Sequence, residues 1–416
     1  MKLTSGNGKS AQSSTPSRTN RVVFDDYGTA PTDGYAGFNV AEGEFALRGK
    51  HTFNLNNSVM VGIRTLMPGA AKPTFVIDGA TVTGGASSYL FCVGASCQTG
   101  DEPHEQSLII TNGASLTVDT LCCGWCSYNA QQVIDVLIDA STLNCTYCLW
   151  ANQSGYAGPK SVFTVRNGSR VYSKGAEVLF AGETELTFTD SILAKSSDLA
   201  CTGLRIENKA SAKGLFRFGS GSHAYVSGLT PLSANGTLTV VFDGGTWHVG
   251  TADTALKIPY ASTSSLGNVT VRFDAGGATI PVDSGRTLTV TKRLTGEGAF
   301  TKTGPGTMTF DTQGVWNSAR TEETKVSGDP LTWGFAGEAQ VEEGTVVVKA
   351  GASAPSAKAR IAAGATLSLV GEVEFGRIAG EGVVSGGTLR GATLEAALDG
   401  RAKVVIAAQD APKSVL

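Results

Sequence analysis

The chain has 416 residues, with 53 Gly, 41% hydrophobic residues, 17% charged residues and a formal net charge of −3. An average protein contains about 7% Gly and about 25% charged residues, so this chain is rich in glycine and poor in charge. The glycines lack the every-third-residue period of collagen, no apolar run approaches the ~20 residues that span a membrane, and no positive field is present to attract nucleic acid. We therefore expect neither a collagen nor a transmembrane helix, and no nucleic-acid partner.

Residues 1–20 consist mainly of Ser, Thr, Gly and Asn and predict a disordered lead-in. The segment contains no apolar stretch of about 7 to 15 residues of the kind that forms a secretory signal. Gly8-Lys9-Ser10 matches the end of a phosphate-binding loop, but Leu3 occupies the place of its first glycine. We expect no phosphate-binding loop, and a chain that is either intracellular or lacks its export signal in this numbering.

A short β segment followed by Asp or Asn, small residues and another apolar position recurs from residue 75 to residue 280. Residues 22–28 have the same form and are a candidate first copy. The seven intervals between the first and last anchor residues average 28 residues. The anchors of the eight clear copies are Asp78, Asn112, Asp139, Asn167, Asp190, Asn208, Asp243 and Asp274.

A unit of this length cannot bury its own apolar side chains, so successive copies are expected to stack and to pair their strands in parallel. The sequence therefore predicts an all-β fold, a parallel β-solenoid of irregular rungs over residues 21–291. A β-sandwich or barrel is the structural alternative. The position four residues after each anchor is expected to face the core, at Val82, Leu116, Leu143, Val171, Ala194, Ala212, Trp247 and Ala278.

The anchors themselves are expected to be structural corner residues, because Asp and Asn tolerate a left-handed backbone and bond to nearby main chain. One irregularity divides them. The preceding apolar residues stand one and three positions before Asp78, Asp139, Asp243 and Asp274, but two and four positions before the other four anchors. A shift of one residue reverses the buried face of a strand, so the two groups of corners must differ in geometry.

Beyond Thr291 the sequence changes to LTGEGAFTKTGPGTMTF at residues 294–310. This pattern resembles the autotransporter-associated β-strand repeat of bacterial passenger domains. EEGTVVVKAG at 342–351 is similar to the second half of the same repeat, and weaker glycine-rich copies follow. Phe300, Lys302, Met308 and Phe310 alternate as in a half-buried strand pair around a glycine turn. The matching residues are Leu294, Gly296, Gly298, Phe300, Lys302, Gly304, Gly306, Thr307, Met308, Phe310, Gly344, Thr345, Val346 and Val348.

The resemblance implies a right-handed parallel β-helix on a large exported bacterial surface protein, outside the cell or on its outer surface. Residues 292–416 are then a repeat region that continues the solenoid. The segment between Phe310 and Glu342 is longer and more charged than the family pattern, and we expect residues 317–323 to form an exposed loop.

The cysteines leave three interpretations open. Cys123-x2-Cys126 and Cys145-x2-Cys148 have the spacing of a four-thiolate zinc site. Local alignment instead places three residues in one column, where they would be stacked core thiols or, in an exported protein, disulfide partners. Those three are Cys92, Cys122 and Cys201. Buried thiols are favoured over disulfides and zinc, so no metal is expected.

The densest polar cluster spans residues 99–105, where an acid and a base could lie together. Its candidates are Asp101, Glu102, His104 and Glu105. A charged run that contains Pro is more often a solvated loop, so no catalytic site is expected there. For a glycan-active β-helix enzyme, the candidates are Arg166, Arg205, Glu207, Arg217 and Arg272, which do not form one column. An exposed aromatic face for sugars could come from Trp125, Tyr128, Tyr147, Trp150 and Tyr156.

We expect a surface, stalk or adhesion segment of an exported bacterial protein, with no catalytic role and no cofactor. Its candidate partners are extracellular glycans and the surfaces of host or neighbouring cells. The enzyme alternative is a polysaccharide lyase or glycoside hydrolase of the β-helix type, although fold alone does not imply function. The third possibility is an inert passenger repeat that binds no ligand.

Overall fold

The computed structural model is all-β, and no helix occurs among the residues that it describes. The chain divides into two compact units: unit 1 holds Met1–Val226 and Thr230–Thr239, and unit 2 holds Ser227–Leu229 and Val240–Leu416. This division lies about 60 residues before the change of sequence texture at Thr291. The structure describes residues 11–12, 21–27, 35–42, 44–50, 52–54, 60–63, 72–83, 90–93, 104–124, 132–152, 160–174, 178–206, 212–231, 236–248, 255–258, 269–316, 323–325, 330–391, 393–398 and 403–405.

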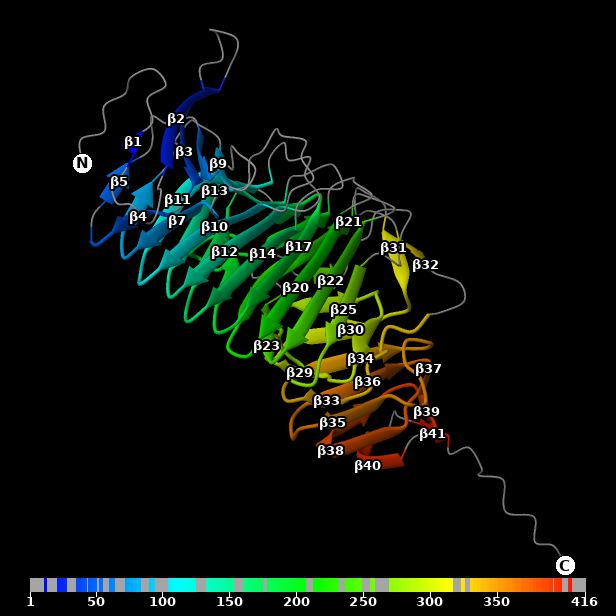
Figure 1. The fold of residues 1–416 in the computed structure, drawn as a ribbon. Coiled ribbons are helices and arrows are strands. Elements are labelled where there is room, and N and C mark those ends of the chain that lie inside the picture. The colour runs from blue at the N-terminus through cyan, green and yellow to red at the C-terminus, as the bar shows by residue number, and fades with distance from the viewer. Residues whose placement is uncertain are drawn as a thin grey trace, which may run out of the picture. The chain divides into compact units, whose positions relative to one another are not determined.

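In unit 1, one strand from each successive repeat joins a parallel sheet in chain order, visible as a row of arrows in Figure 1. The register keeps equivalent residues opposite one another, so Ile110 pairs with Ile77 on one side and with Ile138 on the other. The strands of this first sheet are β4 (Glu44–Arg48), β7 (Thr74–Asp78), β10 (His104–Thr111), β12 (Gln132–Asp139), β14 (Lys160–Arg166), β17 (Glu183–Phe188) and β20 (Lys213–Gly219).

After the first sheet each repeat turns a corner and supplies strands at a second and a third position. β11 (Ser115–Cys123) and β13 (Thr142–Asn152) are long enough to occupy both positions, with a register shift between Val118 and Thr120. The other second-position strands are β5 (Thr52–Asn54), β8 (Thr81–Thr83), β15 (Arg170–Ser173), β18 (Ile192–Ala194) and β21 (His223–Pro231). Those at the third position are β3 (Tyr35–Glu42), β6 (Met60–Ile63), β9 (Leu90–Val93), β16 (Val178–Phe180) and β19 (Thr202–Ile206).

The core of unit 1 consists of columns of apolar residues that the register stacks. β12 alternates strictly between buried and half-buried residues, as a strand with one face in the core does. Two columns of the first sheet are buried to 1% exposure or less. They are Phe75, Leu108, Val136, Phe163, Leu186 and Phe216, and Ile77, Ile110, Ile138, Val165, Phe188 and Phe218. Parallel pairing of successive repeats is the pairing expected of stacked repeats, not of a sandwich.

The positions four residues after the anchors are all buried, as expected, but they do not form one column. Val82, Leu116, Leu143 and Val171 do stack in register. The next members of the column are Leu193 and Ala224, so placing Ala194 and Ala212 there was wrong. The cause is the unequal length of the corners, which moves the register by one residue or more. The anchor Asn208 lies outside the described residues.

The two groups of corners differ in which residue adopts the left-handed backbone. Asp78 and Asp139 end their strands, and the residue after each has positive φ: 68° at Gly79 and 50° at Ala140. In the other group the anchor itself is left-handed, with φ 59° at both Asn112 and Asn167. Strand register agrees, because Asp139 pairs with Arg166, the residue before Asn167. This explains the offset of one residue in the sequence pattern.

The N-terminal strands are paired differently from the repeats. β1 (Ala11–Gln12) pairs antiparallel with β2 (Arg21–Tyr27), and β2 pairs antiparallel with β3. Residues 22–28 are therefore not a first copy of the parallel unit, because their neighbour runs in the opposite direction. Apart from β1, the segment 1–20 that was predicted as a disordered lead-in lies outside the described residues.

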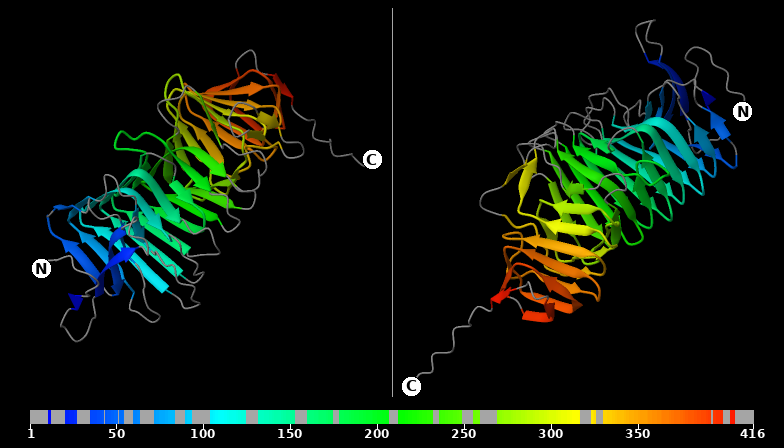
Figure 2. Two further views of the ribbon diagram at one scale, coloured as in Figure 1. Left: turned by 90° about the horizontal axis from the view of Figure 1, so that it is seen from above. Right: turned by 180° about the vertical axis from the view of Figure 1, so that it is seen from behind.

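Unit 2 is also built from parallel ladders, seen from two further directions in Figure 2. One ladder contains β23 (Gly245–His248), β26 (Ala278–Pro281), β29 (Phe300–Thr303), β33 (Glu338–Val341), β35 (Lys358–Ile361), β38 (Arg377–Ser385) and β40 (Thr393–Leu398). A second contains β24 (Ala255–Ile258), β27 (Thr287–Val290), β30 (Thr307–Phe310), β34 (Thr345–Lys349), β36 (Thr366–Val370) and again β38. The remaining strands are β22 (Thr237–Asp243), β25 (Val269–Phe273) and β28 (Leu294–Gly296), the antiparallel pair β31 (Gly314–Trp316) and β32 (Glu323–Lys325), and β37 (Glu372–Glu374), β39 (Thr388–Arg390) and β41 (Lys403–Val405).

The family-like segment 294–310 forms three short strands, β28, β29 and β30. Phe300, Lys302, Met308 and Phe310 are all buried, which agrees with their alternation. β29 and β30 do not pair with each other around the glycines, because they belong to different ladders and pair with β33 and β34. The match between 307–310 and 345–348 is confirmed by register, which pairs Thr307 with Thr345 and Phe310 with Val348.

An aromatic cluster fills the centre of unit 2. Trp333 stacks on Phe335, with ring centroids 5.1 Å apart, and meets Phe310 at 4.7 Å. Phe300 and Phe375 contact the same indole ring edge-on. Trp333 follows the β31–β32 hairpin, which interrupts the repeat between β30 and β33. Of the loop expected at 317–323, Glu323 begins β32, and the rest lies outside the described residues.

Candidate functional site

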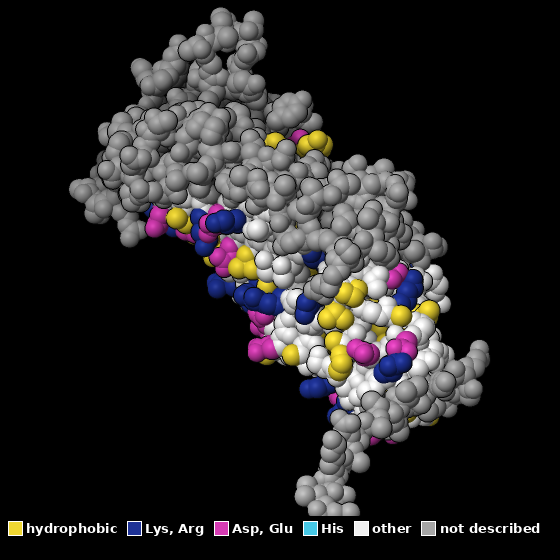
Figure 3. Space-filling view, turned by 90° about the vertical axis from the view of Figure 1, so that its right-hand side faces the viewer, with side chains coloured by type: hydrophobic (Ala, Val, Ile, Leu, Met, Phe, Trp, Pro, Cys, Tyr) yellow, Lys and Arg dark blue, Asp and Glu magenta, His cyan; other side chains and the backbone are white. Residues whose placement is uncertain are grey.

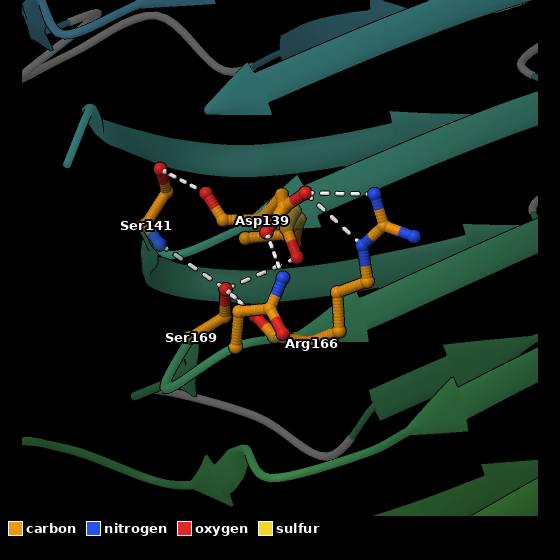
Figure 4. Close-up of polar contacts among 6 residues, drawn as sticks. Asp139, Ser141, Arg166 and Ser169 are labelled. Atoms are coloured by element: carbon orange, nitrogen blue, oxygen red, sulfur yellow. Dashed lines mark hydrogen bonds and ion pairs between the residues drawn. The ribbon is translucent and has the colours of Figure 1, made fainter. Parts of the chain in front are cut away.

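The corner between β12 and β13 gathers several polar side chains (Figure 4). The Asp139 carboxylate accepts hydrogen bonds from Arg166 Nε at 3.0 Å, from Arg166 Nη2 at 2.8 Å and from Asn167 Nδ2 at 2.6 Å. The hydrogen bonds from Arg166 and Asn167 hold the pKa of Asp139 below its usual range. This carboxylate is ionised and occupied by neighbours on the next repeat.

Two serines complete this corner. Ser169 Oγ donates to the main-chain oxygen of Arg166 at 2.6 Å and accepts from the Ser141 amide at 3.1 Å. Ser141 Oγ in turn donates to the main-chain oxygen of Asp139 at 2.8 Å. Each of the five side chains, of Asp139, Ser141, Arg166, Asn167 and Ser169, thus has a partner inside the cluster, which fits the interpretation of the corner acids as structural.

The same arrangement recurs at other corners. Asn112 Nδ2 donates to Asp78 Oδ1 at 2.7 Å in unit 1. In unit 2 the Gly276 amide donates to Asp243 Oδ1 at 2.8 Å. In each case an Asp at one corner accepts a hydrogen bond from the left-handed or glycine-rich corner of the following repeat.

The candidate acid–base cluster at 101–105 is only partly described. Asp101 and Glu102 lie outside the described residues, and only the backbone of His104 is described, as the first residue of β10. Glu105 is exposed and pairs with Lys72 at 3.4 Å, while Lys72 Nζ donates to Asp135 at 2.7 Å. Partial burial lowers the pKa of Lys72, but Asp135 and Glu105 outweigh it and the net pKa is raised. The structure thus brings Glu105 to a surface ion-pair cluster.

The arginines considered for a glycan-active site lie at separate places. Arg166 is held by Asp139, and Arg272 is held by Asp274 through contacts of 2.6 and 3.2 Å. Arg217 lies in β20 in register with Thr187. The side chain of Arg205 and all of Glu207 lie outside the described residues. The described arginines therefore do not converge on a common point within either unit.

Four cysteines lie in the long strands β11 and β13 and are buried to 1% exposure or less: Cys122, Cys123, Cys145 and Cys148. Register pairs Cys122 with Cys92 on one side and with Trp150 on the other. The column continues to Leu179 and Arg205, so placing Cys201 in it was wrong. Repeats of unequal length explain the error, since a similar local sequence does not imply the same register.

The zinc interpretation receives no support from the described cysteines. Cys145 and Cys148 pair with Val118 and Thr120, and the described residues contain no group of three or more potential metal ligands. Burial raises the pKa of the Cys145 thiol to about 12. No disulfide joins any two of the five cysteines whose side chains are described. The side chain of Cys92 and all of Cys126 lie outside the described residues, so a disulfide of Cys92 and a zinc site that includes Cys126 stay predictions.

The proposed aromatic face is also only partly described. Tyr147 is 59% exposed, and Trp150 is half-buried in β13. Trp125, Tyr128 and Tyr156 lie outside the described residues. Tyr147 is therefore the one exposed ring of this group that the described structure provides.

The lysine of the T-K-x-G-x-G-T pattern has a role that the sequence did not reveal. Lys302 is fully buried in unit 2, and its Nζ donates to the main-chain oxygens of Gly304 and, at 2.7 Å, of Glu343. Burial lowers its pKa to about 8. Gly344 is required beside it, because a Cβ there would lie 2.5 Å from Nζ. Lys302 thus joins the corner before β30 to the corner before β34.

A second feature missed in the sequence is a set of hydroxyl side chains on the second ladder of unit 2, which we call the threonine array. Register stacks Thr287, Thr307, Thr345 and Thr366 in one row. A parallel row contains Thr289, Thr309, Val347 and Ser368. All eight side chains are half-buried and alternate with core residues. The recurring T-x-T or T-x-S spacing is the signal that could have revealed it.

Charged side chains of both signs lie next to one another on the surface. Figure 3 shows Lys and Arg beside Asp and Glu across the described part of this view. Lys160 pairs with Glu185 at 3.1 Å in unit 1, and Arg377 bridges Glu338 and Glu395 at 3.2 and 3.0 Å in unit 2. Such pairs cancel one another and leave little field to attract a polyanion.

No described segment forms a helix that is long and apolar enough to cross a membrane. Comparison with protein-family models, with curated proteins and with solved structures yields no match for this chain.

Proposed function

We propose that this chain is a right-handed parallel β-solenoid segment of an exported bacterial surface protein, which serves as a stalk and adhesion module. Right-handedness is the rule for parallel strands joined by crossover connections, and the family-like repeat at 294–351 favours the same hand. The observation that carries the proposal is the in-register stacking of successive repeats in parallel ladders within each unit.

This stacking suits a structural element. Each repeat is joined to the next by main-chain hydrogen bonds along its strands and by side-chain bonds at its corners, as between Asp139 and Asn167. Repeats that contact only their neighbours can be added without a new core, which is how solenoids reach the length that a stalk needs.

The outer faces suit adhesion. Because the register is maintained from strand to strand, one type of side chain recurs at a fixed spacing across a face, as in the threonine array. A repeated surface gains avidity from many weak contacts with a repeated partner. The acids that could perform chemistry at the described corners are instead engaged in structural bonds.

Two measurements test this function. Antibodies to the purified chain should label intact cells that express the native gene, and beads coated with the chain should adhere to extracellular polysaccharide or to cells. Incubation with these glycans should release no new reducing ends or unsaturated products. Labelling only after the cells are lysed would overturn the surface assignment, and glycan turnover would replace the adhesive role with an enzymatic one.

A further inference from the structure

The threonine array forms two rows across four successive strands of one ladder, β27, β30, β34 and β36. Neighbouring strands lie about 4.8 Å apart and residues two apart on a strand are about 6.6 Å apart, so each row of four spans roughly 14 Å. The residues between the rows are Leu288, Met308, Val346 and Leu367, all fully buried. These buried side chains fix the strands that carry the hydroxyls, so little entropy is lost when a ligand is bound.

The hydroxyls of this array are available for a ligand. A Thr or Ser hydroxyl both donates and accepts a hydrogen bond. Within the described part of the chain, no side-chain hydrogen bond engages Thr287, Thr289, Thr307, Thr309, Thr345, Thr366 or Ser368. Their β-carbon methyl groups, together with Val347, supply apolar patches between the hydroxyls.

The charge around the array indicates the class of ligand. The array contains no charged residue. At its borders, Lys257 of β24 is in register with Thr289, and Lys349 is paired with Asp311 at 2.7 Å. A polyanion would meet no row of cations here. A neutral polymer with many hydroxyl groups can exchange hydrogen bonds with the rows and place its C–H surfaces against the methyl groups.

We propose that the threonine array binds an extended, neutral, β-linked polysaccharide of the cellulose or chitin type, an assignment that rests on the proposed adhesive function. The rows repeat at every strand, so an extended chain with regularly repeated hydroxyls contacts every strand of the array. A coiled or branched chain can reach only part of it. Each contact is weak, and the affinity arises from their number.

The test is co-sedimentation of the full chain with microcrystalline cellulose and with chitin, with soluble branched amylopectin tested by affinity electrophoresis. The array variant carries Thr307→Val, Thr309→Val, Thr345→Val and Thr366→Val, which remove hydroxyls but keep the β-branched shape. We expect it to bind about tenfold or more weaker than the wild type, because several hydrogen bonds are lost together. Amylopectin should bind neither protein.

The matched control carries Thr279→Val and Thr301→Val, two threonines in register on β26 and β29 that lie outside the array. It should bind within about twofold of the wild type, since it keeps every hydroxyl of the array. Circular dichroism and thermal melting should show that both variants are folded. A wild type that sediments with neither polysaccharide, or an array variant that binds as the wild type does, would overturn the assignment. If beads coated with the chain still adhere to cells in either case, the adhesive function is retained and only the polysaccharide assignment is wrong.

Discussion

Adjacent repeats are connected at their corners by different interactions in unit 1 and in the family-like part of unit 2. In unit 1, side chains connect adjacent repeats, as Asp78 does with Asn112 and Asp139 with Asn167. In the family-like part of unit 2, the backbone of a glycine corner lies so close to the backbone of the preceding repeat that no side chain fits at the glycine. Gly296 has φ 114°, and a Cβ there would collide with the Phe273 carbonyl oxygen.

This difference explains the high glycine content. In unit 1, Gly79 provides a positive φ after a strand-ending Asp, and the carboxylate connects the repeats. In the family-like part of unit 2, residues 294–351, adjacent repeats are connected by main-chain contact and by the buried Lys302 ammonium. A side-chain hydrogen bond between corners, such as that of Asp78 with Asn112, tolerates substitution better than a close backbone contact does. Mutations at the corners should therefore lower the unfolding free energy less in unit 1 than in unit 2.

The largest expected effect is Gly296→Ala. The new Cβ would require both an unfavourable φ and a displaced Phe273 carbonyl, so we expect a loss of about 4 kcal/mol in the free energy of unfolding. Urea unfolding followed by circular dichroism measures it. The matched control is Gly285→Ala, where φ is 71° but nothing lies within 4 Å of the new Cβ, and about 1 kcal/mol is expected. Equal losses would show that close approach does not matter at this corner.

A pH effect of intermediate size is expected from Lys302. Its pKa is about 8 in the folded state and has an ordinary value of 10.5, so the unfolded chain binds more protons between these values. The stabilising contribution is present above pH 10.5 and is lost as pH falls through 8. The free energy of unfolding should therefore rise between pH 8 and pH 10, by at most about 3 kcal/mol for this lysine.

The variant Lys302→Met should reduce that rise, and the remainder should come from Lys292, whose pKa burial also lowers to about 8. Lys358→Met, at an exposed position in the same unit, should leave the rise unchanged. Urea unfolding at pH 7.5 and pH 10 provides the comparison. An unchanged pH dependence in Lys302→Met would mean that the ammonium is not desolvated at this corner.

A smaller effect is expected for Asp139→Ala in unit 1. The variant removes hydrogen bonds from Arg166 and Asn167 at a partly exposed corner, and about 1–2 kcal/mol should be lost at pH 7. Because the pKa of Asp139 is lowered in the folded state, its contribution is present above its ordinary value of 3.8 and is lost as pH falls through the folded-state pKa. Wild type and variant should thus converge in acid. Asp198→Ala, at an exposed position in unit 1, should have no measurable effect on the unfolding free energy. A loss there similar to that of Asp139→Ala would show that the hydrogen bonds of Asp139 do not stabilise the corner.

The smallest expected effect is an increase in the unfolding free energy, where the preceding variants lower it. Thr184 lies in the core of unit 1 at 1% exposure, and its hydroxyl has no hydrogen-bond partner among the described residues. Replacing a buried hydroxyl that makes no hydrogen bond by a methyl group is neutral or stabilising, so Thr184→Val should change the unfolding free energy by about 0 to +1 kcal/mol. Thr164→Val, at a half-buried position on the neighbouring strand β14, should leave the unfolding free energy unchanged. A clear loss in Thr184→Val would reveal a hydrogen bond to this hydroxyl.

Much of the architecture was predictable because its signals are local. The anchors Asp78 and Asp139 mark real corners, and the apolar residues before them are buried in stacked columns. The family-like pattern correctly aligned Thr307 with Thr345, since a glycine corner precedes both strands.

The predictions that were wrong or missing concern residues brought together by register between strands that are distant in the sequence. Cys201 was aligned by its neighbours in sequence, but the strand position opposite Leu179 belongs to Arg205. The threonine array was missed because its rows also contain Thr287 and Thr366, and only the register of the ladder places these beside Thr307 and Thr345. The hydrogen bonds of Lys302 were not predicted because its partners are main-chain oxygens, one of them 41 residues away.

Asp and Asn alternate at successive corners of unit 1, from Asp78 to Asn167, and this alternation limits how the number of repeats can change. Asp78 and Asp139 each accept a hydrogen bond from the Asn corner of the following repeat, at Asn112 and Asn167. Loss of the single repeat that carries Asn112 would set the carboxylates of Asp78 and Asp139 side by side, with no amide between them. Loss or duplication of two consecutive repeats preserves every acceptor–donor match. Unit 1 can therefore change its length by recombination in steps of two repeats, and steps of one carry an electrostatic cost.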